Sequence, residues 1–274
     1  MSERVAVRKT YKLFIGGKFP RSESGRSYIV QDANVALSSR KDARDAVVAA
    51  RAAVKGWAGA TAYNRGQILY RVAEMLEGRR EQFVALGVPA DEVDAAIDRW
   101  VWYAGWSDKL AQVYGGANPV AGPYFNLSAP EPTGVVAVVA PEAPALLGLV
   151  SVIAPAIVTG NTVVVAASPA QPLAAVTLAE VLATSDLPGG VVNILTGRLS
   201  ETVPTLAGHM DVNAIDLTGV ADAELAADLE VKAAQNLKRV LRPAPVDHDW
   251  FADPGIARMT TLLETKTVWH PKGV

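Results

Sequence analysis

The segment between residues 131 and 217 constrains the fold most, because strand and helix patterns alternate along it. It opens with an apolar, mostly β-branched run at residues 134–140, which has no polar residue to place on a solvated face. Such a run is typical of a parallel strand that is covered on both faces. Similar short apolar runs follow at residues 162–166, 191–195 and 214–217. The segment therefore predicts four strands of one buried sheet.

Helical patterns separate the first three of these strands. Residues 145–159 are long enough for about four helical turns, and Pro155 is expected to kink or shorten that helix. Pro172 suits the first turn of a second helix that continues to residue 183. Strands that alternate with helices form a right-handed, parallel sheet covered by helices, so we expect an α/β fold.

The usual phosphate-binding loops are missing from this segment. No G-x-G-x-x-G follows the first strand, and the sequence contains no G-x-x-x-x-G-K-[ST]. Pattern reasoning alone therefore leaves the ligand of the α/β domain open.

Several motifs resemble the cofactor domain of the aldehyde dehydrogenase family, in the order and spacing of that family. They lie at residues 131–141, 154–156, 160–165, 187–197 and 217–219. The resemblance implies a Rossmann-type cofactor domain, a parallel sheet covered by helices, together with oligomerisation strands.

The resemblance extends over most of the chain. Residues 13–18 resemble the N-terminal strand of the family, and residues 236–240 resemble the segment before its catalytic glutamate. Residues 120–130 look extended and correspond to part of the family's oligomerisation sheet. Residues 265–269 resemble its C-terminal oligomerisation strand.

The reaction of the family requires a cysteine thiolate, an asparagine that holds the oxyanion, a glutamate base and a nicotinamide cofactor. The chain has no cysteine. Glu142 and Ala143 stand where the family has Trp-Asn, and residues 241–245 replace the stretch that contains the glutamate. We therefore expect no catalytic residues of the family's kind.

The positions that would hold the cofactor have also changed. Residues 166–169 replace the family's Lys-Pro-Ser-Glu, and Val220 replaces the serine of its Thr-Gly-Ser turn. Four vestigial positions remain, and they are interpreted first as helix-stop, cap and turn residues: Asn161, Ser168, Thr218 and Gly219. We expect no cofactor, and only weak binding if NAD or NADP binds at all.

Charge and composition exclude several other classes. The chain has 26 basic and 28 acidic residues, which gives no electrostatic case for a nucleic acid or an anionic membrane. The uncharged run at residues 143–179 is divided by prolines and suits a covered sheet better than a membrane span. The three histidines show no metal-ligand spacing. The lack of cysteine fits a cytoplasmic protein.

The remaining sequence shows mainly helical patterns. Helices are expected from Asp42 as N-cap to Trp57, over residues 65–86 and 91–114, and over residues 222–239. The aromatic residues of the third pattern are expected in the core, and residues 115–119 in a turn. Residues 259–269 suggest an amphipathic strand with Glu264 and Lys266 on one face.

These patterns divide the chain into five parts. They are an N-terminal strand with helices (1–119), an extended oligomerisation segment (120–130), the cofactor-like domain (131–241), a linker (242–255) and an oligomerisation strand (256–274). The linker is rich in proline and aspartate and stands where the family inserts its catalytic domain. We therefore expect that domain to be missing.

Two functions from different classes follow. The first is a pseudoenzyme, similar to the cysteine-less second region of aldehyde dehydrogenase family sixteen, which assembles with a full-length aldehyde dehydrogenase, with itself, or with both. Its expected interface is Glu264, Thr265, Lys266, Thr267, Val268 and Trp269. The alternative is an active oxidoreductase with a rebuilt site, using Ser168 or Thr218 with Glu142, or a sensor that binds NAD without turnover.

Overall fold

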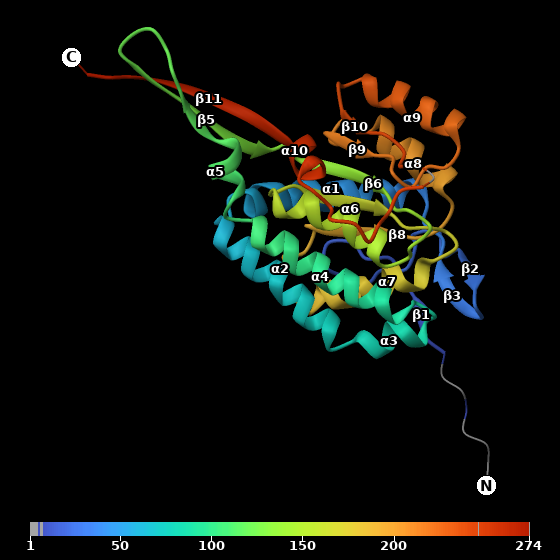
Figure 1. Ribbon diagram of the computed structural model, residues 1–274. Coiled ribbons are helices and arrows are strands. Elements are labelled where there is room, and N and C mark those ends of the chain that lie inside the picture. Colours follow the sequence, from blue (N-terminus) through green and yellow to red (C-terminus); the bar gives the residue numbers. More distant parts are fainter. Residues whose placement is uncertain (1–4, 6–7, 246, 274) are drawn as a thin grey trace.

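A five-stranded parallel sheet forms the centre of the protein (Figure 1). The structure, a computed structural model, describes residue 5 and residues 8–245 and 247–273. The strand order is β10-β9-β6-β7-β8, and the strands are β6 (Val135–Val139), β7 (Thr162–Ala166), β8 (Val192–Leu195), β9 (Ala214–Asp216) and β10 (Arg239–Leu241). The predicted covered parallel sheet is confirmed, with β10 as a strand that the sequence patterns did not show.

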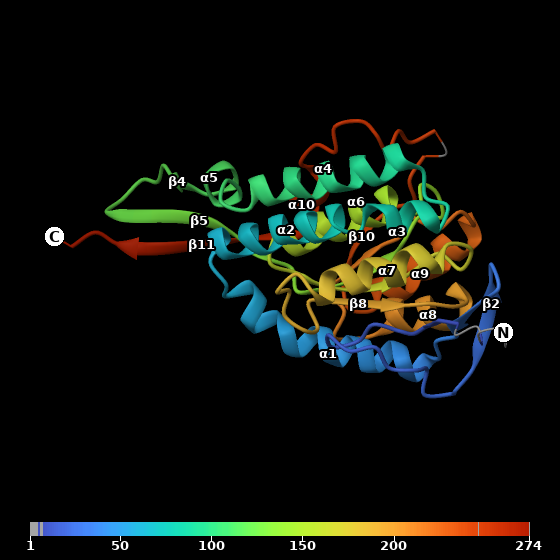
Figure 2. The same ribbon diagram turned by 90° about the horizontal axis from the view of Figure 1, so that it is seen from below.

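Both faces of the sheet are buried, as the apolar runs predicted. Val136 and Val138 of β6 face a core formed with α6 (Leu147–Val158) and α7 (Pro172–Ala183). Val135 and Val139 face the opposite core. That second core is formed with α1 (Arg40–Ala58), α8 (Leu199–Gly208) and α9 (Ala223–Ala234). Figure 2 shows α1 and α8 on one side of the molecule and α2 (Ala62–Glu77) and α4 (Ala90–Trp106) on the other.

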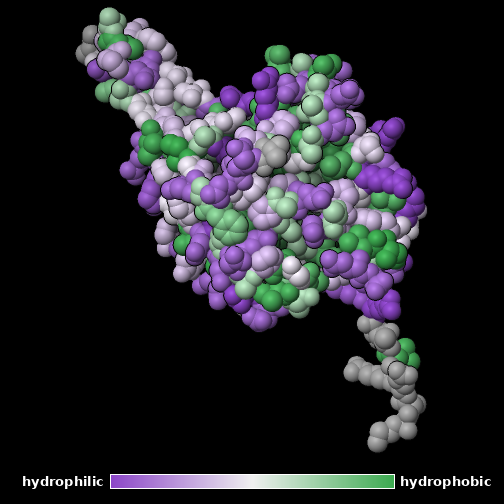
Figure 3. Space-filling model, turned by 45° about the vertical axis from the view of Figure 1, so that its right-hand side comes forward, coloured by the Kyte–Doolittle hydropathy of each residue, from purple (hydrophilic) through white to green (hydrophobic). Residues whose placement is uncertain are grey.

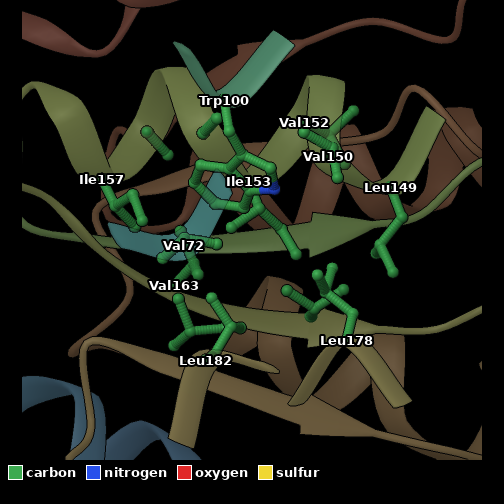
Figure 4. Close-up of a cluster of buried hydrophobic side chains, with 14 of the residues drawn as sticks. Val72, Trp100, Leu149, Val150, Val152, Ile153, Ile157, Val163, Leu178 and Leu182 are labelled. Carbon is green, nitrogen blue, oxygen red and sulfur yellow. The ribbon is translucent and has the colours of Figure 1, made fainter. Parts of the chain in front are cut away.

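The aromatic residues of α4 pack into the core. The indole of Trp100 lies against Ile153 of α6, close to Val72 of α2 (Figure 4). Trp100 and Tyr103 are fully buried, and Trp102 and Trp106 are partly buried against the same cluster. The expectation that these aromatic residues are core rather than a stacking surface is confirmed.

The first long helix begins earlier than predicted. Ser39, not Asp42, is the N-cap of α1, and Asp42 occupies the third helical position. The Ser39 hydroxyl accepts from the amide of Asp42, and the Asp42 carboxylate accepts from the amide of Ser39. This reciprocal capping box explains the shift, because it satisfies two backbone donors that Asp42 alone would leave open.

Three other predicted helices are shorter than their patterns. Residues 65–86 divide at Gly78 into α2 and α3 (Arg80–Ala85), and residues 91–114 divide into α4 and α5 (Leu110–Tyr114). The predicted helix at residues 222–239 ends at Ala234, because Leu237 takes a positive φ of 56° and the chain then enters β10. Backbone turns and strand pairing end these helices, but the apolar periodicity of the sequence continues past the ends, so it predicts helices that are too long.

The N-terminal region also differs from expectation. Strand β1 (Thr10–Tyr11) pairs with β3 (Ala33–Ala36), which pairs with β2 (Ser27–Val30). Residues 13–18, expected as a strand, make only isolated bridges, because Gly16 and Gly17 turn the chain with φ of 61° and 77°. Strands β2 and β3 and helix α8 were not predicted.

A third sheet, which is antiparallel, projects from the body as an arm (Figure 1). Its order is β11-β5-β4, with β4 (Gly116–Asn118), β5 (Tyr124–Pro132) and β11 (Leu263–Pro271). Strand β4 lies where a turn was expected. Residues 259–261 belong to the short helix α10 (Ala257–Thr261), so the predicted strand at residues 259–269 begins only at Leu263.

Between β10 and α10 the chain has no helix or strand in its described residues, 242–245 and 247–255. None of the helices in the described part is long and apolar enough to cross a membrane.

Candidate functional site

Parallel pairing brings the carboxyl ends of β6, β7 and β9 to one edge of the sheet. Val139 of β6 is level with Ala166 of β7, and Val138 is level with Asp216 of β9. Glu142, Ser168 and Thr218 come shortly after these ends. Open α/β sheets bind ligands at this edge, so it is the first candidate site.

The hydroxyl of Thr218 is held in a buried ion-pair network. It donates to the carboxylate of Asp216 and accepts from Nη1 of Arg258 at 2.9 Å. The same Nη1 lies 2.7 Å from Oδ2 of Asp216, and Asp216 is only 2% exposed. Thr218 is therefore part of a buried hydrogen-bond and ion-pair network that joins β9 to α10.

Ser168 and Glu142 are not paired with each other. The Ser168 hydroxyl accepts from the amide of Ala170 at 3.2 Å, which closes a local turn. Glu142 is exposed, and among the described residues no hydrogen bond joins it to Ser168 or Thr218. The geometry thus contains no nucleophile–base pair built from these residues.

Gly219 marks a close approach of two strand ends. Its amide donates to the carbonyl of Val139 at 3.0 Å. A Cβ at this position would collide with the carbonyl of Ala140. The glycine is therefore explained by packing of the β9 end against the β6 end.

Asn161 lies away from the other three vestigial positions, before the amino end of β7. Its Oδ1 accepts from the amide of Gly134 at 2.7 Å, and its Nδ2 donates to Thr159 and to the carbonyl of Leu262. The side chain is fully buried. Asn161 joins the starts of β6 and β7 to the chain after α10, and the structure does not bring it to the carboxyl edge.

Carboxylates occupy the amino ends of two helices that face this region. Oε1 of Glu92 accepts from the amides of Leu146 and Leu147 at the start of α6, at 2.6 and 3.2 Å. Oδ1 of Asp222 accepts from the amides of Glu224 and Leu225 at the start of α9, at 2.9 and 3.2 Å. Free amides at such helix ends are where α/β proteins bind phosphate groups. In this protein the carboxylates of Glu92 and Asp222 already accept from the amides at these two helix ends.

The linker between β10 and α10 is fastened to the body. Nη2 of Arg99 donates to the carbonyls of Trp250 and Ala252, at 2.8 and 3.0 Å, and Nη1 donates to the hydroxyl of Ser151 at 3.0 Å. Nearer β10, the amide of Ala244 donates to the carbonyl of Thr218. In Figure 1 the linker, drawn in red, crosses in front of α6.

Sequence reasoning missed the three charged residues that organise this region, Asp216, Arg258 and Arg99. Asp216 left a signal, because it is a single acid within an apolar strand and a buried acid needs a partner. Arg99 and Arg258 left none, since only the folded chain brings them to the linker and to β9.

One face of the arm presents an apolar strip, and the other combines a polar hydrogen-bond network with the Tyr124–Trp269 pair. On one face, Leu127 of β5 is opposite Val268 of β11, with Phe125 beside them, and each of the three side chains is about half exposed. On the other face, hydrogen bonds join Asn118 to Asn126 and Ser128, and join Ser128 to Thr267. Figure 3 shows the arm standing clear of the body, with hydrophobic surface near its tip.

The expected interface residues Glu264, Thr265, Lys266, Thr267, Val268 and Trp269 lie on β11, the outer strand of the arm. All six are exposed. Within the chain, Glu264 pairs with Arg239 at 2.6 Å and Lys266 with Glu131 at 3.0 Å. The ring of Trp269 packs edge-on against Tyr124, with centroids 5.7 Å apart. The outer edge of β11 has no further strand beside it in the described part of the chain.

No metal centre is apparent within the part of the chain that the structure describes. Groups of three or more histidine, aspartate or glutamate side chains that could hold an ion are absent there.

Comparison with known families gives a match to the aldehyde dehydrogenase family over residues 31–242. A putative aldehyde dehydrogenase of Bacillus subtilis, DhaS, is 31% identical over 250 residues, which cover 84% of this chain and 50% of that protein. The mitochondrial benzaldehyde dehydrogenase of Antirrhinum majus is 31% identical over 248 residues, covering 84% and 46%. The mouse cytosolic 10-formyltetrahydrofolate dehydrogenase is 32% identical over 240 residues, covering 79% and 26%. The chain thus spans about half, or less, of these relatives.

Solved structures give the same result. The NAD⁺ complex of an aldehyde dehydrogenase from Bacillus cereus superposes with a TM-score of 0.79 at 26% identity, over 85% of this chain and 50% of that one. HpcC from Thermus thermophilus superposes with a TM-score of 0.78 at 28% identity, over 85% and 47%.

Proposed function

Because the chain belongs to the aldehyde dehydrogenase family, an NAD(P)-dependent family whose proteins it matches over about half their length, we propose that it is a non-catalytic member. It serves as a structural or regulatory subunit beside a full-length aldehyde dehydrogenase, beside further copies of itself, or both. The proposal places it in the cytoplasm, as the name of the mouse relative does for that protein.

The lack of any thiol carries the proposal. The sequence contains no cysteine, so the thiolate that the family's chemistry requires cannot form on this chain. Hydroxyl substitutes are poorly placed, since Thr218 is tied to Asp216 and Arg258, and Ser168 closes a turn. A hydroxyl needs an adjacent free base to act as a nucleophile.

The residues present do not fit a dinucleotide cofactor either. Glu92 and Asp222 accept from the first amides of α6 and α9, so bound phosphates would meet carboxylates in place of free N–H donors. Repulsion between like charges would add to the loss of those donors. We therefore propose that NAD and NADP bind weakly or not at all.

The projecting arm supports a role in assembly. In the single chain, an apolar strip formed by Phe125, Leu127 and Val268 is exposed to solvent. The outer edge of β11 offers backbone groups that no strand of the described residues pairs with. An exposed edge strand beside an apolar strip is a surface on which another chain can add. The interface proposed from the sequence, at Glu264, Thr265, Lys266, Thr267, Val268 and Trp269, lies along this edge.

Native mass measurement of arm variants tests the assembly. Leu127→Lys and Val268→Lys each place a charge in the apolar strip without removing a ladder hydrogen bond. We expect either variant to shift the protein toward a smaller particle in light scattering. The matched control is Val231→Lys on α9, where a valine is 69% exposed outside the arm. An unchanged mass in both arm variants would contradict an interface on this face.

The partner is identified by gentle purification of the protein from its own cells. A particle that also contains a cysteine-bearing chain of the same family supports the mixed assembly. A particle of this chain alone limits the proposal to a homo-oligomeric scaffold, and a monomer would refute it.

A further inference from the structure

A cavity of about 240 Å³ lies between α4, α6 and the linker, away from the arm. Arg99, Tyr103 and Ser151 line it from the helices, and Trp250 and Arg258 line it from the linker and α10. Arg99 and Tyr103 are both at least nine-tenths buried.

Arg99 is a buried cation that no carboxylate of the described residues contacts, and the Asp253 carboxylate acts on it only from beyond ion-pair distance. Its nitrogens donate to the Ser151 hydroxyl and to two linker carbonyls, and no ion pair among the described residues involves it. Burial lowers the pKa of Arg99, but an arginine stays protonated in proteins. A buried charge without a counter-ion costs free energy, and an anion in the adjoining cavity would reduce that cost.

Tyr103 contributes a donor without an acceptor. Its ring is fully buried, and its hydroxyl has no hydrogen-bond partner among the described residues. Burial raises the pKa of Tyr103 to about 12, so the hydroxyl keeps its proton at neutral pH. A buried hydroxyl without a partner is uncommon and calls for a ligand or water that accepts from it.

The rim of the cavity limits the charge that a ligand can carry. Asp249 and Asp253 line the rim and are exposed, and each accepts from a backbone amide at 2.9 Å, of Phe251 and Gly255 respectively. These carboxylates would repel a second negative charge at the mouth of the cavity. The Trp250 ring also lines the cavity and supplies apolar surface there.

We propose that this cavity binds a small monocarboxylic acid, with the carboxylate oxygens accepting from Arg99 and Tyr103 and a short apolar body against Trp250. Arginine and hydroxyl donors suit a planar carboxylate, and the acidic rim disfavours dicarboxylates and phosphate. The inference does not depend on assembly or on the lack of catalysis.

The test is calorimetry and ligand-observed NMR of the full chain with sodium propionate as the probe. Propionamide serves as the neutral control of the same shape, and succinate and inorganic phosphate as the more highly charged probes. We expect saturable binding of propionate, and much weaker binding of the other three. No binding of propionate up to about 50 mM, the range of weak small-ligand affinities, would overturn the proposal, as would equal binding of propionamide or phosphate.

The informative variant is Tyr103→Phe, which removes only a hydroxyl that donates to no described group. This variant should reduce the affinity for propionate about tenfold, because one hydrogen bond to a charged acceptor is lost. The melting temperature of the free protein should not fall. Tyr28→Phe is the control for loss of a buried tyrosine hydroxyl, because Tyr28 lies on β2, outside the cavity. Unchanged affinity in Tyr103→Phe, or an equal loss in Tyr28→Phe, would refute the assignment.

Discussion

At the scale of single residues, the Asp216–Arg258 pair holds the carboxyl edge of the sheet to α10. Asp216 is 2% exposed, so it depends on Arg258 and Thr218 in place of water. Arg258→Met would leave a buried carboxylate without its counter-ion. We expect a loss of about 3 kcal/mol in the free energy of unfolding, measured by urea denaturation.

The control for this variant is Arg71→Met, which breaks an exposed pair with Glu74 on α2. Exposed pairs contribute less than about 1 kcal/mol, so this control should be nearly neutral. In Asp216→Asn/Arg258→Met the buried charge is removed as well, and part of the lost stability should return. If Arg258→Met lowers the free energy of unfolding no more than the control does, Asp216 is solvated and its ion pair with Arg258 does not stabilise the fold.

At the scale of elements, the arm meets the body through Glu264 of β11 and Arg239 of β10. Arg239 donates to this carboxylate and holds the pKa of Glu264 below its ordinary value of 4.5. A carboxyl with a lowered folded-state pKa stabilises the fold above that ordinary value and loses the contribution as the pH falls through the folded pKa. We expect Glu264→Gln to lower the melting temperature at pH 7 by about 1–3 °C.

The difference in melting temperature between Glu264→Gln and the wild type should narrow as the pH falls from 4.5 through the lower folded-state pKa of Glu264, because the wild-type carboxyl becomes protonated over that range. It should also narrow in 1 M salt, since Glu264 and Arg239 are both partly exposed. A difference in melting temperature that does not change between pH 7 and acid would show that the glutamine acts through packing and not through the ion pair.

At the scale of the whole molecule, the isolated chain should neither oxidise aldehydes nor bind the cofactor tightly. Spectrophotometry with NAD or NADP and a panel of aldehydes should show no reduced cofactor above the blank. Calorimetry should give a dissociation constant for NAD weaker than about 1 mM, an affinity of about 4 kcal/mol.

Two results would revive the alternatives. A rate of NADH formation that Glu142→Ala abolishes would establish an oxidoreductase with a rebuilt site. Micromolar NAD binding without turnover would establish a sensor. In that case Asp222→Ala, which frees the first amides of α9, should increase the affinity for phosphate-containing ligands, because the helix end could then bind an anion.

The sequence by itself determined the central sheet and the absence of thiol chemistry. Covered parallel strands need apolar residues on both faces, so a run such as residues 134–140 is recognisable without a structure. Family motifs located the same domain, and a missing cysteine is a fact of composition. Local helix ends were predicted less well, because the Ser39 capping box and the break at Gly78 depend on backbone geometry that apolar periodicity does not record.

Only the tertiary structure decided how the vestigial and charged residues are used. Asn161 and Thr218 looked alike as remnants of one site, but the chain places them toward opposite edges of the sheet. Arg99 is about 150 residues from the linker carbonyls that it binds. Their meeting depends on how α4 packs against α6 and on the path of the linker. Side-chain partners so distant in sequence leave no local pattern, because their interaction energy exists only after the core has brought them together.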